Sequence, residues 1–472
     1  MWYLTLKIDK LLLFIGIIAS ATFIVLAARG DLWLDEIWSL KFVEMAHSPS
    51  EIFTSFQHDN NHLLNTFYLY FLGQKDTLIL YRMLSVFMGI GAILLLSLTA
   101  GSYGNFERVC VVYLAGLSYP LILYFSEARG YAAAIFFAIA SYELLKRIWV
   151  RATPVKRVLF WLATMLGSLS HSTFIIVLSA LIITSIAHLI IRGISVKDRI
   201  RDFFDLYFVP IFFQTFLYMR YIRNMEIGGG PVYSTMTVIN EIISTGWGFY
   251  PPQAPLSLFL DMIFITLIIL GIWLCYREKQ LDWVFFFMVL LVSPCMFLLI
   301  NKPRFLYFRY FLICLPFFYL LLSHILGVWY RSFVRWRVII ILLITLLVIS
   351  HADNIISLLL NGRGHYRQAL NEMAAATNGQ IISVASDHDF RNKMVLDFYA
   401  RFLDPSKYLR YITRDHLKEA QSEWMILHNQ DLNWNSPQKL QVEGVAKPYS
   451  LFRIYTYSGI SGWNWYIYRQ GK

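Results

Sequence analysis

Charged residues are scarce in this sequence: they make up 15% of its 472 residues, whereas 57% are hydrophobic. A soluble protein of this composition would expose far too much apolar surface to water. The composition therefore predicts an integral membrane protein. Cysteine is scarce as well, and the four cysteines lie in apolar runs, as small buried side chains do, so neither a disulfide framework nor a cysteine metal site is expected. They are Cys110, Cys275, Cys295 and Cys314.

Long apolar runs recur along the first three quarters of the chain. A helix rises about 1.5 Å per residue, so roughly 20 apolar residues cross the hydrocarbon of a bilayer. The first run is too long for the apolar core of a signal peptide, so it is expected to remain as a span. We predict about eleven transmembrane helices, at 11–28, 78–100, 108–125, 131–149, 158–170, 173–191, 203–220, 255–276, 282–300, 307–328 and 336–352. The shorter run 62–73 is predicted to be an interfacial helix, with a short span as the alternative.

The net charge of +11 gives the predicted spans an orientation. Basic residues gather in the loops that stay in the cytoplasm, and residues 146–157 and 192–201 are such clusters. Placing them and the N-terminus in the cytoplasm accounts for the basic balance without a nucleic-acid partner. The chain is then a multi-pass protein of a plasma membrane or bacterial inner membrane. Its extracytoplasmic parts are 29–77, 126–130, the turn near His171, 221–254, 301–306 and everything after 352.

The apolar runs stop after residue 352. Helical periodicity is found at 365–378 and 389–403. Runs typical of strands are 380–386, 424–429, 449–457 and 464–470. About 110 residues suffice for one small domain. The expected fold class is therefore a polytopic α-helical membrane protein, residues 1–352, with a small extracytoplasmic α/β domain, residues 353–472.

The first outer loop carries an adjacent pair of acids, Asp35 and Glu36, flanked by Trp33 and Trp38. Indole rings prefer the boundary between membrane and water, so the acids are expected at that boundary. A carboxylate there can accept a proton from a hydroxyl, and partial loss of water makes it a better base. Adjacent helical residues point about 100° apart, so one acid would act and the other support it. The alternative is an acid pair that stabilises a helix N-terminus.

Two groups of cations lie in other outer loops. A guanidinium can hold a phosphate through two parallel hydrogen bonds, and basic residues are unusual on the outer side, so an anionic lipid headgroup is the expected ligand. The alternatives are an arginine that snorkels beside Glu127, and phosphate binding without chemistry. In the first group the cation is Arg129, with Glu127 and Tyr131 beside it in the sequence. In the second the cations are Lys302, Arg304 and Arg309, followed by Tyr310.

A polar run in the first outer loop contains His58, Asp59 and His62. Histidines four residues apart can hold a divalent metal, with Asp59 or Asp35 as a further ligand. Hydrogen bonding to a sugar or phosphate is the favoured interpretation, and plain loop polarity is the third. His171 lies at another outer turn, where it either contacts substrate or is a satisfied polar residue.

The outer loop 221–254 contains three consecutive glycines, Gly228 to Gly230. Glycine allows unusual backbone angles, so this loop is a candidate lid over the site. The alternative is an ordinary connector with a short helix at 235–244.

The order of these motifs resembles the GT-C superfamily of membrane glycosyltransferases, nearest to the protein mannosyltransferase and aminoarabinose transferase-like group. The resemblance covers residues 1 to about 330. It rests on the Asp–Glu pair, the histidine-containing run, Ser-Glu-Ala-Arg-Gly-Tyr at 126–131, the outer histidine, and an Arg-Tyr pair before a span with Pro316. The sequence lacks the lumenal β-trefoil insert of the mannosyltransferases. It also has His-Asp-Asn-Asn-His where many relatives have His-x-Pro-Pro, so the acceptor class stays open.

The resemblance implies a GT-C-like fold and inverting transfer of a sugar from a polyprenyl-phosphate donor to a protein, lipid or glycan. It implies that Asp35 is the base and that the outer arginines hold the donor phosphate. No cofactor is assigned, and a divalent metal remains an option. A lipid or lipid-linked sugar flippase is the alternative, although it would need polar groups at mid-membrane and repeated halves, which the sequence lacks. A non-catalytic scaffold would leave the outer cations without a role.

Overall fold

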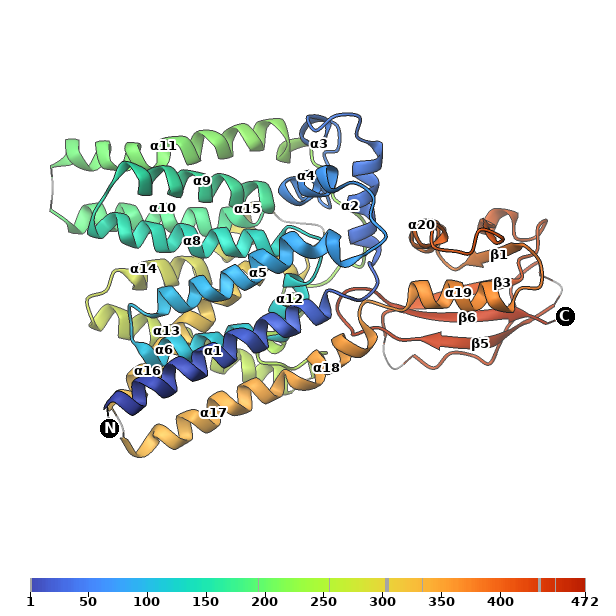
Figure 1. The fold of residues 1–472 in the computed structure, drawn as a ribbon. Coiled ribbons are helices and arrows are strands. Elements are labelled where there is room, and N and C mark those ends of the chain that lie inside the picture. Colours follow the sequence, from blue (N-terminus) through green and yellow to red (C-terminus); the bar gives the residue numbers. More distant parts are fainter. Residues whose placement is uncertain are drawn as a thin grey trace. The chain divides into compact units, whose positions relative to one another are not determined.

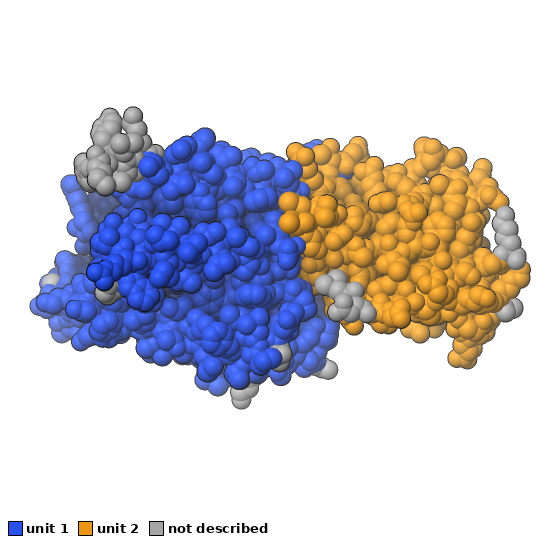
Figure 2. Space-filling view, turned by 90° about the horizontal axis from the view of Figure 1, so that it is seen from below, with its two compact units in different colours: residues 1–28, 42–75, 80–355 blue, residues 29–41, 76–79, 356–472 orange. Residues whose placement is uncertain are grey.

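The computed structural model describes residues 2–193, 195–253, 255–301, 305–332, 334–431, 434–445 and 447–471, so Lys302 and Arg304 lie outside the described residues. The chain forms two compact units (Figure 2). The first contains Met1–Ala28, Phe42–Lys75 and Leu80–Ile355. The second contains Arg29–Lys41, Asp76–Ile79 and Ile356–Lys472. The second unit thus includes residues 29–41 of the first outer loop as well as the C-terminal residues.

Helices make up the first unit, and most of the long ones run roughly side by side (Figure 1). The helices that begin in the first half of the chain are α1 (Trp2–Ala27), α2 (Leu34–Met45), α3 (Glu51–Thr54), α4 (Leu63–Leu72), α5 (Ile79–Ala100), α6 (Asn105–Gly116), α7 (Tyr119–Phe125), α8 (Tyr131–Val150), α9 (Pro154–Ser170), α10 (Phe174–Ile191), α11 (Val196–Arg220) and η1 (Ile222–Asn224). They are followed by α12 (Thr235–Gly246), α13 (Leu256–Arg277), α14 (Asp282–Phe287), η2 (Met288–Val292), α15 (Ser293–Asn301), η3 (Phe308–Cys314), α16 (Leu315–Ser332), η4 (Val334–Trp336), α17 (Arg337–Ser350) and α18 (Ala352–Asn361).

Each of the eleven predicted spans falls on helical structure. Within the described residues, seven helical stretches are long and apolar enough to cross a membrane, and the bent pair of α6 and α7 would make an eighth. Helices α8, α9 and α11 cover three further predicted spans but do not reach that standard. Helix α4 has 10 residues and is about 15 Å long, half the thickness of the hydrocarbon, which agrees with a helix that does not span.

The second unit is built around a six-stranded mixed sheet with the strand order β2-β1-β3-β6-β5-β4. Strands β2, β1 and β3 are parallel, and β3, β6, β5 and β4 are antiparallel. The strands are β1 (Ile381–Ser386), β2 (Tyr408–Tyr411), β3 (Trp424–Asn429), β4 (Lys439–Leu440), β5 (Tyr449–Tyr455) and β6 (Asn464–Gln470). The helical elements that lie wholly in this unit are α19 (Tyr366–Ala376), α20 (Asp389–Ala400) and η5 (Arg414–His416), and the unit also includes the start of α2 and the end of α18. All four predicted strands and both predicted helices are confirmed. The short strands β2 and β4 were not predicted.

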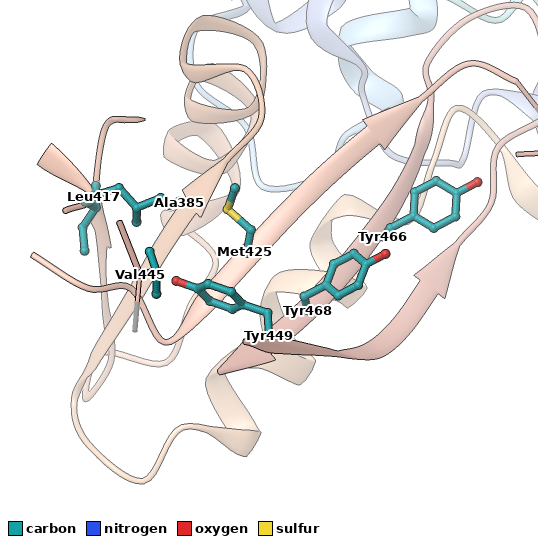
Figure 3. Packing of buried hydrophobic residues seen from close by; sticks show 8 residues of the cluster. Ala385, Leu417, Met425, Val445, Tyr449, Tyr466 and Tyr468 are labelled. Carbon is teal, nitrogen blue, oxygen red and sulfur yellow. The ribbon is translucent and has the colours of Figure 1, made fainter. Parts of the chain in front are cut away.

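The two faces of the sheet carry different side chains because residues alternate along a strand. Ala385, Met425 and Tyr468 are paired across β1, β3 and β6 and lie in one apolar cluster, together with Tyr449 (Figure 3). The opposite face of β6 presents Trp465, which contacts both helices. Its ring packs edge-on against Tyr366 of α19, 4.8 Å between ring centres, and its Nε1 donates to Asn392 of α20.

Candidate active site

Arg129 lies at the centre of a polar cluster in the first unit, in the turn between α7 and α8. Its side chain is 3% exposed. Nε donates to His62 Nε2 at 3.2 Å, and one terminal nitrogen donates to Asn60 Oδ1 at 3.0 Å. The backbone of the turn is also fixed, because Asn65 Nδ2 donates to the Ala128 carbonyl at 2.8 Å. The guanidinium is thus oriented by neutral acceptors from the first outer loop.

Four aromatic rings form a connected group that includes His62, a partner of this arginine. His62 stacks on His171, with 4.9 Å between ring centres, and Tyr131 lies 4.4 Å from His171 and 5.5 Å from His62. Tyr310 is the fourth ring, 6.4 Å from His171. The rings come from the segment before α4, the start of α8, the turn between α9 and α10, and η3. Loops far apart in sequence therefore meet at one end of the helical unit.

The segment that carries His58, Asp59 and His62 is held by hydrogen bonds from one tyrosine. The hydroxyl of Tyr221, at the end of α11, lies within hydrogen-bond distance of the carbonyls of Phe56, His58 and Asn61, at 3.0 to 3.2 Å. Tyr221 is itself buried in an apolar cluster with Leu63. This packing fixes a loop that would otherwise have few apolar anchors.

Asp59 connects this segment to the loop that contains the three glycines. Its backbone N–H donates to the Glu226 carbonyl at 2.9 Å, and its Oδ1 accepts from the Gly228 N–H at 3.0 Å. Farther along, a Cβ on Gly230 would clash with the hydroxyl oxygen of Tyr307, so a larger residue there would displace that side chain. The glycine loop thus contacts the polar segment. The helix predicted at 235–244 is confirmed as α12, and movement of the loop as a lid stays a prediction.

The charges of the cluster shift its pKa values in consistent directions. Burial lowers the pKa of His62 well below its usual value and that of His171 to about 3, and the positive charges of Arg129 and Arg309 lower both further. Both imidazoles are therefore neutral at physiological pH. For Asp59, burial alone would raise the pKa, but hydrogen bonds from His58 and Gly228 and the charge of Arg309 outweigh it and lower the pKa. Asp59 is therefore ionised.

Glu241 on α12 is a second carboxylate that senses Arg309, and the sequence did not single it out. Burial raises its pKa to about 7, while Arg309 opposes the shift. Helix α12 packs on η3, the element that carries Arg309. The sequence did contain a signal for Glu241, because it is an acid within an amphipathic helix predicted in an outer loop.

The predicted acid pair belongs to the second unit. Glu36 is buried, and its Oε2 accepts from the backbone N–H of Trp33 at 3.2 Å, which caps the N-terminus of α2. Asp35 is partly exposed. One acid therefore supports the helix start and the other is accessible, the division expected for adjacent helical residues.

Residues 31–38 fold together with the C-terminal residues. The Arg367 N–H donates to Asp31 Oδ2 at 2.8 Å, and the Tyr399 hydroxyl donates to the Leu32 carbonyl at 3.0 Å. Trp33 packs edge-on against Trp463, and Trp38 against Phe390, with ring centres 6.4 and 5.2 Å apart. The segment that carries the predicted base is therefore a structural part of the second unit.

The candidate site residues thus fall into three sets. Gathered in the first unit are His58, Asp59, His62, Glu127, Arg129, Tyr131, His171, Arg309 and Tyr310. Asp35 and Glu36 lie in the second unit, and Lys302 and Arg304 lie outside the described residues. Asn60 and Tyr221 were missed, because an amide that orients an arginine and a tyrosine that supports a loop leave no spacing pattern in a sequence. In the described part of the chain, no group of three histidine, cysteine, aspartate or glutamate side chains is placed to hold a metal ion.

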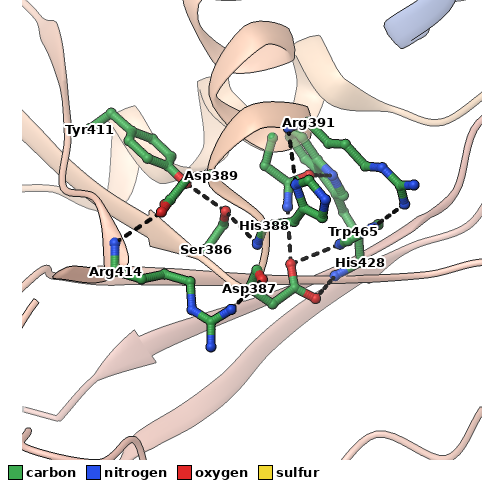
Figure 4. A network of polar contacts seen from close by, with 10 residues as sticks. Ser386, Asp387, His388, Asp389, Arg391, Tyr411, Arg414, His428 and Trp465 are labelled. Carbon is green, nitrogen blue, oxygen red and sulfur yellow. Dashed lines mark hydrogen bonds and ion pairs between the residues drawn. The ribbon is translucent and has the colours of Figure 1, made fainter. Parts of the chain in front are cut away.

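A separate polar network lies in the second unit, where β1 and β3 end beside the start of α20 (Figure 4). His428 Nδ1 and Asp387 Oδ1 are 2.8 Å apart, and His428 Nε2 lies 3.2 Å from Arg391. Asn392 also donates to Asp387 Oδ1, at 3.1 Å. The groups of this network satisfy one another.

The fold matches a known structure, although the sequence matches no family model and no curated protein. A crystal structure of ArnT from Cupriavidus metallidurans in the apo state superposes with a TM-score of 0.53 at 12% sequence identity. The match covers 88% of this chain and 92% of that chain. This likeness confirms the fold expected from the resemblance to the aminoarabinose transferase-like group: a polytopic helical membrane protein with a small C-terminal sheet domain.

Proposed function

We propose that this protein is an integral-membrane glycosyltransferase that transfers a sugar from a polyprenyl-phosphate donor to an acceptor hydroxyl on the extracytoplasmic side, with inversion. The observation that carries the proposal is the buried Arg129, oriented by His62 and Asn60 and joined by the charge of Arg309. A guanidinium can hold a phosphate through two parallel hydrogen bonds. A lipid-linked phosphate is therefore the ligand that we propose for these arginines.

In the proposed reaction, the acceptor oxygen attacks the anomeric carbon as the bond from that carbon to the phosphate oxygen breaks. Phosphate leaves with the electron pair, and Arg129 and Arg309 stabilise its added charge, with Lys302 and Arg304 as further proposed ligands. The acceptor proton passes to Asp35, while Glu36 keeps the helix start in place. Phosphate is a good leaving group once its charge is neutralised, so no general acid is needed and the paired carboxylates of a glycosidase are not expected.

The test is transfer by the full chain in lipid nanodiscs, with polyprenyl-phosphate hexoses as donors and alkyl glycosides, lipids and peptides as acceptors. We expect Asp35→Asn to lower turnover by at least about 100-fold, the usual contribution of a general base, with donor affinity unchanged. Asp76→Asn, an exposed acid of the same outer loop, is the matched control. Near-normal turnover of Asp35→Asn would remove Asp35 from the mechanism. Lipid translocation without any transferred sugar would favour the flippase alternative, and adding EDTA tests for a divalent metal.

A further inference from the structure

A small polar cavity in the first unit has no part in the mechanism above. It measures about 30 Å³. A site of this size holds roughly two water molecules, so it is far too small for a sugar ring but accepts one hydroxyl group. Its walls come from the polar segment, the turn between α9 and α10, and the end of α11, and include Asp59, Asn61, His62, Ser170, His171 and Tyr221.

We propose that this cavity is a specificity subsite that binds one hydroxyl group of a sugar substrate, with Asp59 as acceptor and His171 as donor. The inference rests on the proposed function and adds to it the kind of sugar that is recognised: one with a neutral hydroxyl at the position that enters the cavity.

The donor is fixed by the tautomer of His171. Its Nδ1 accepts from the backbone N–H of Thr173 at 3.2 Å and lies 2.8 Å from the Thr173 hydroxyl. A neutral imidazole that accepts at Nδ1 carries its hydrogen on Nε2. His171 is 6% exposed and lines the cavity, and Nε2 makes no hydrogen bond with another described residue. An N–H on a residue this buried has few possible acceptors in the protein, and a ligand oxygen can provide one.

The acceptor is the Asp59 carboxylate. Its side chain is 23% exposed, so it can be reached, and the Gly228 N–H holds its Oδ1 in place. A hydroxyl can donate to this carboxylate and accept from an imidazole N–H at the same time. Asp59 would repel a carboxylate on the ligand, and the charges of Arg129 and Arg309, which act on His62 and His171, disfavour an ammonium group.

The rings beside the cavity hold the His171 imidazole, the proposed hydrogen-bond donor, in place. His171 contacts both His62 and Tyr131, which also contact each other, and Arg129 donates to His62 Nε2. The phosphate-binding arginine and the proposed subsite thus share one ring stack. A sugar carried by the bound phosphate, or an acceptor sugar beside it, would present its hydroxyl here.

The experiment is a coupling cycle between protein and substrate. Full-length wild type, Asp59→Asn, His171→Phe and His171→Gln in nanodiscs are assayed for binding and transfer with polyprenyl-phosphate mannose, polyprenyl-phosphate glucose and their monodeoxy analogues. A second arm keeps the donor whole and uses octyl mannoside, octyl glucoside and their monodeoxy analogues as acceptors. His188→Phe is the matched control, because His188 stacks on Trp149 at the other end of α10, 4.4 Å between ring centres.

We expect one deoxy analogue to lose roughly 10- to 100-fold in kcat/KM with wild type, the usual effect of a buried partner left unpaired. With Asp59→Asn or His171→Phe, the same analogue should have nearly the same kcat/KM as the parent sugar. Removing the hydroxyl and removing its protein partner break one and the same interaction. His171→Gln, which keeps an N–H near the position of Nε2, should recover part of the discrimination. The arm in which coupling is found tells whether the hydroxyl belongs to the donor or to the acceptor.

Independent losses for every analogue in both arms, with an active wild type, would overturn the subsite and leave the proposed function standing. A wild type that neither binds nor uses any polyprenyl-phosphate sugar would instead overturn the proposed function, and the subsite with it. Unchanged selectivity in both Asp59→Asn and His171→Phe would also overturn the subsite, whatever the fate of either variant alone.

Discussion

Two histidine-containing regions of this protein use the same residue types in opposite ways. In the second unit, His428 has an aspartate at Nδ1 and an arginine at Nε2, so both ring nitrogens are occupied. In the first unit, His171 has Thr173 at Nδ1, and the residue lines a cavity. The first arrangement closes a network, and the second leaves a donor for a ligand. The role of a histidine is therefore indicated by how many of its ring nitrogens are hydrogen-bonded within the protein.

Arginines show the same contrast. Arg391 lies beside His428 and 5.8 Å from the ring centre of Trp463, in contacts that stabilise the fold. Arg129 donates to His62 and Asn60, which orient its guanidinium within the candidate site. Substituting the same residue type in each of the two regions tests this interpretation.

The largest expected effect is that of Arg129→Ala. Removing one preorganised donor to developing charge typically costs 10²- to 10³-fold in rate, so we expect transfer to fall by about that factor and donor affinity to fall with it. Arg391→Ala, its counterpart in the closed network, should leave the affinity of the donor unchanged. Titration of both variants with polyprenyl phosphate, together with single-turnover transfer, measures this. Equal losses in the two variants would contradict the distinction.

A smaller effect is expected from His428→Phe in the second unit. The substitution leaves Asp387 without one hydrogen-bond partner, which typically costs about 1–3 kcal/mol. We expect a lower midpoint of thermal unfolding for the second unit, followed by hydrogen exchange of β1 and β3. His171→Phe should lower the thermal midpoint less, because it keeps the ring contacts with His62 and Tyr131. A larger loss for His171→Phe would show that the first-unit stack is structural.

The last expected effect is on pH dependence, and it is absent at neutral pH. The folded protein keeps His171 neutral down to about pH 3, whereas an unfolded histidine binds a proton near pH 6.5. The unfolded state therefore holds more protons as the pH falls below 6.5, and stability decreases. We expect His171→Gln to make the decline between pH 6 and pH 4 shallower by up to about 1.4 kcal/mol per pH unit. Parallel stability curves for the variant and wild type would argue against a neutral buried imidazole.

Much of this structure could be predicted from local sequence patterns. Apolar runs located the helices, and short runs rich in strand-forming residues located β1, β3, β5 and β6, because both signals depend on residues close in sequence. The cations of the site were found because they stood on the outer side of the predicted topology. Strands β2 and β4, with four and two residues, were too short to leave such a pattern.

Other parts of the site depend on contacts that no local pattern records. Asn60 and Tyr221 act through partners 69 and 160 or more residues away. The packing of Trp33 on Trp463 was equally hidden, because it joins the two ends of the sequence. The identity of the residues that form the spans could be predicted, and the partners of the polar loops could not.

The contacts of residues 31–33 have a practical meaning for anyone who shortens this protein. A chain cut after Ile355 would keep every apolar stretch and would look, by hydropathy, like an intact membrane enzyme. It would also lack Arg367, Tyr399 and Trp463, the groups that hold the start of α2. The residues after 355 therefore support the segment that carries Asp35, the predicted catalytic acid. Removing them would remove that support.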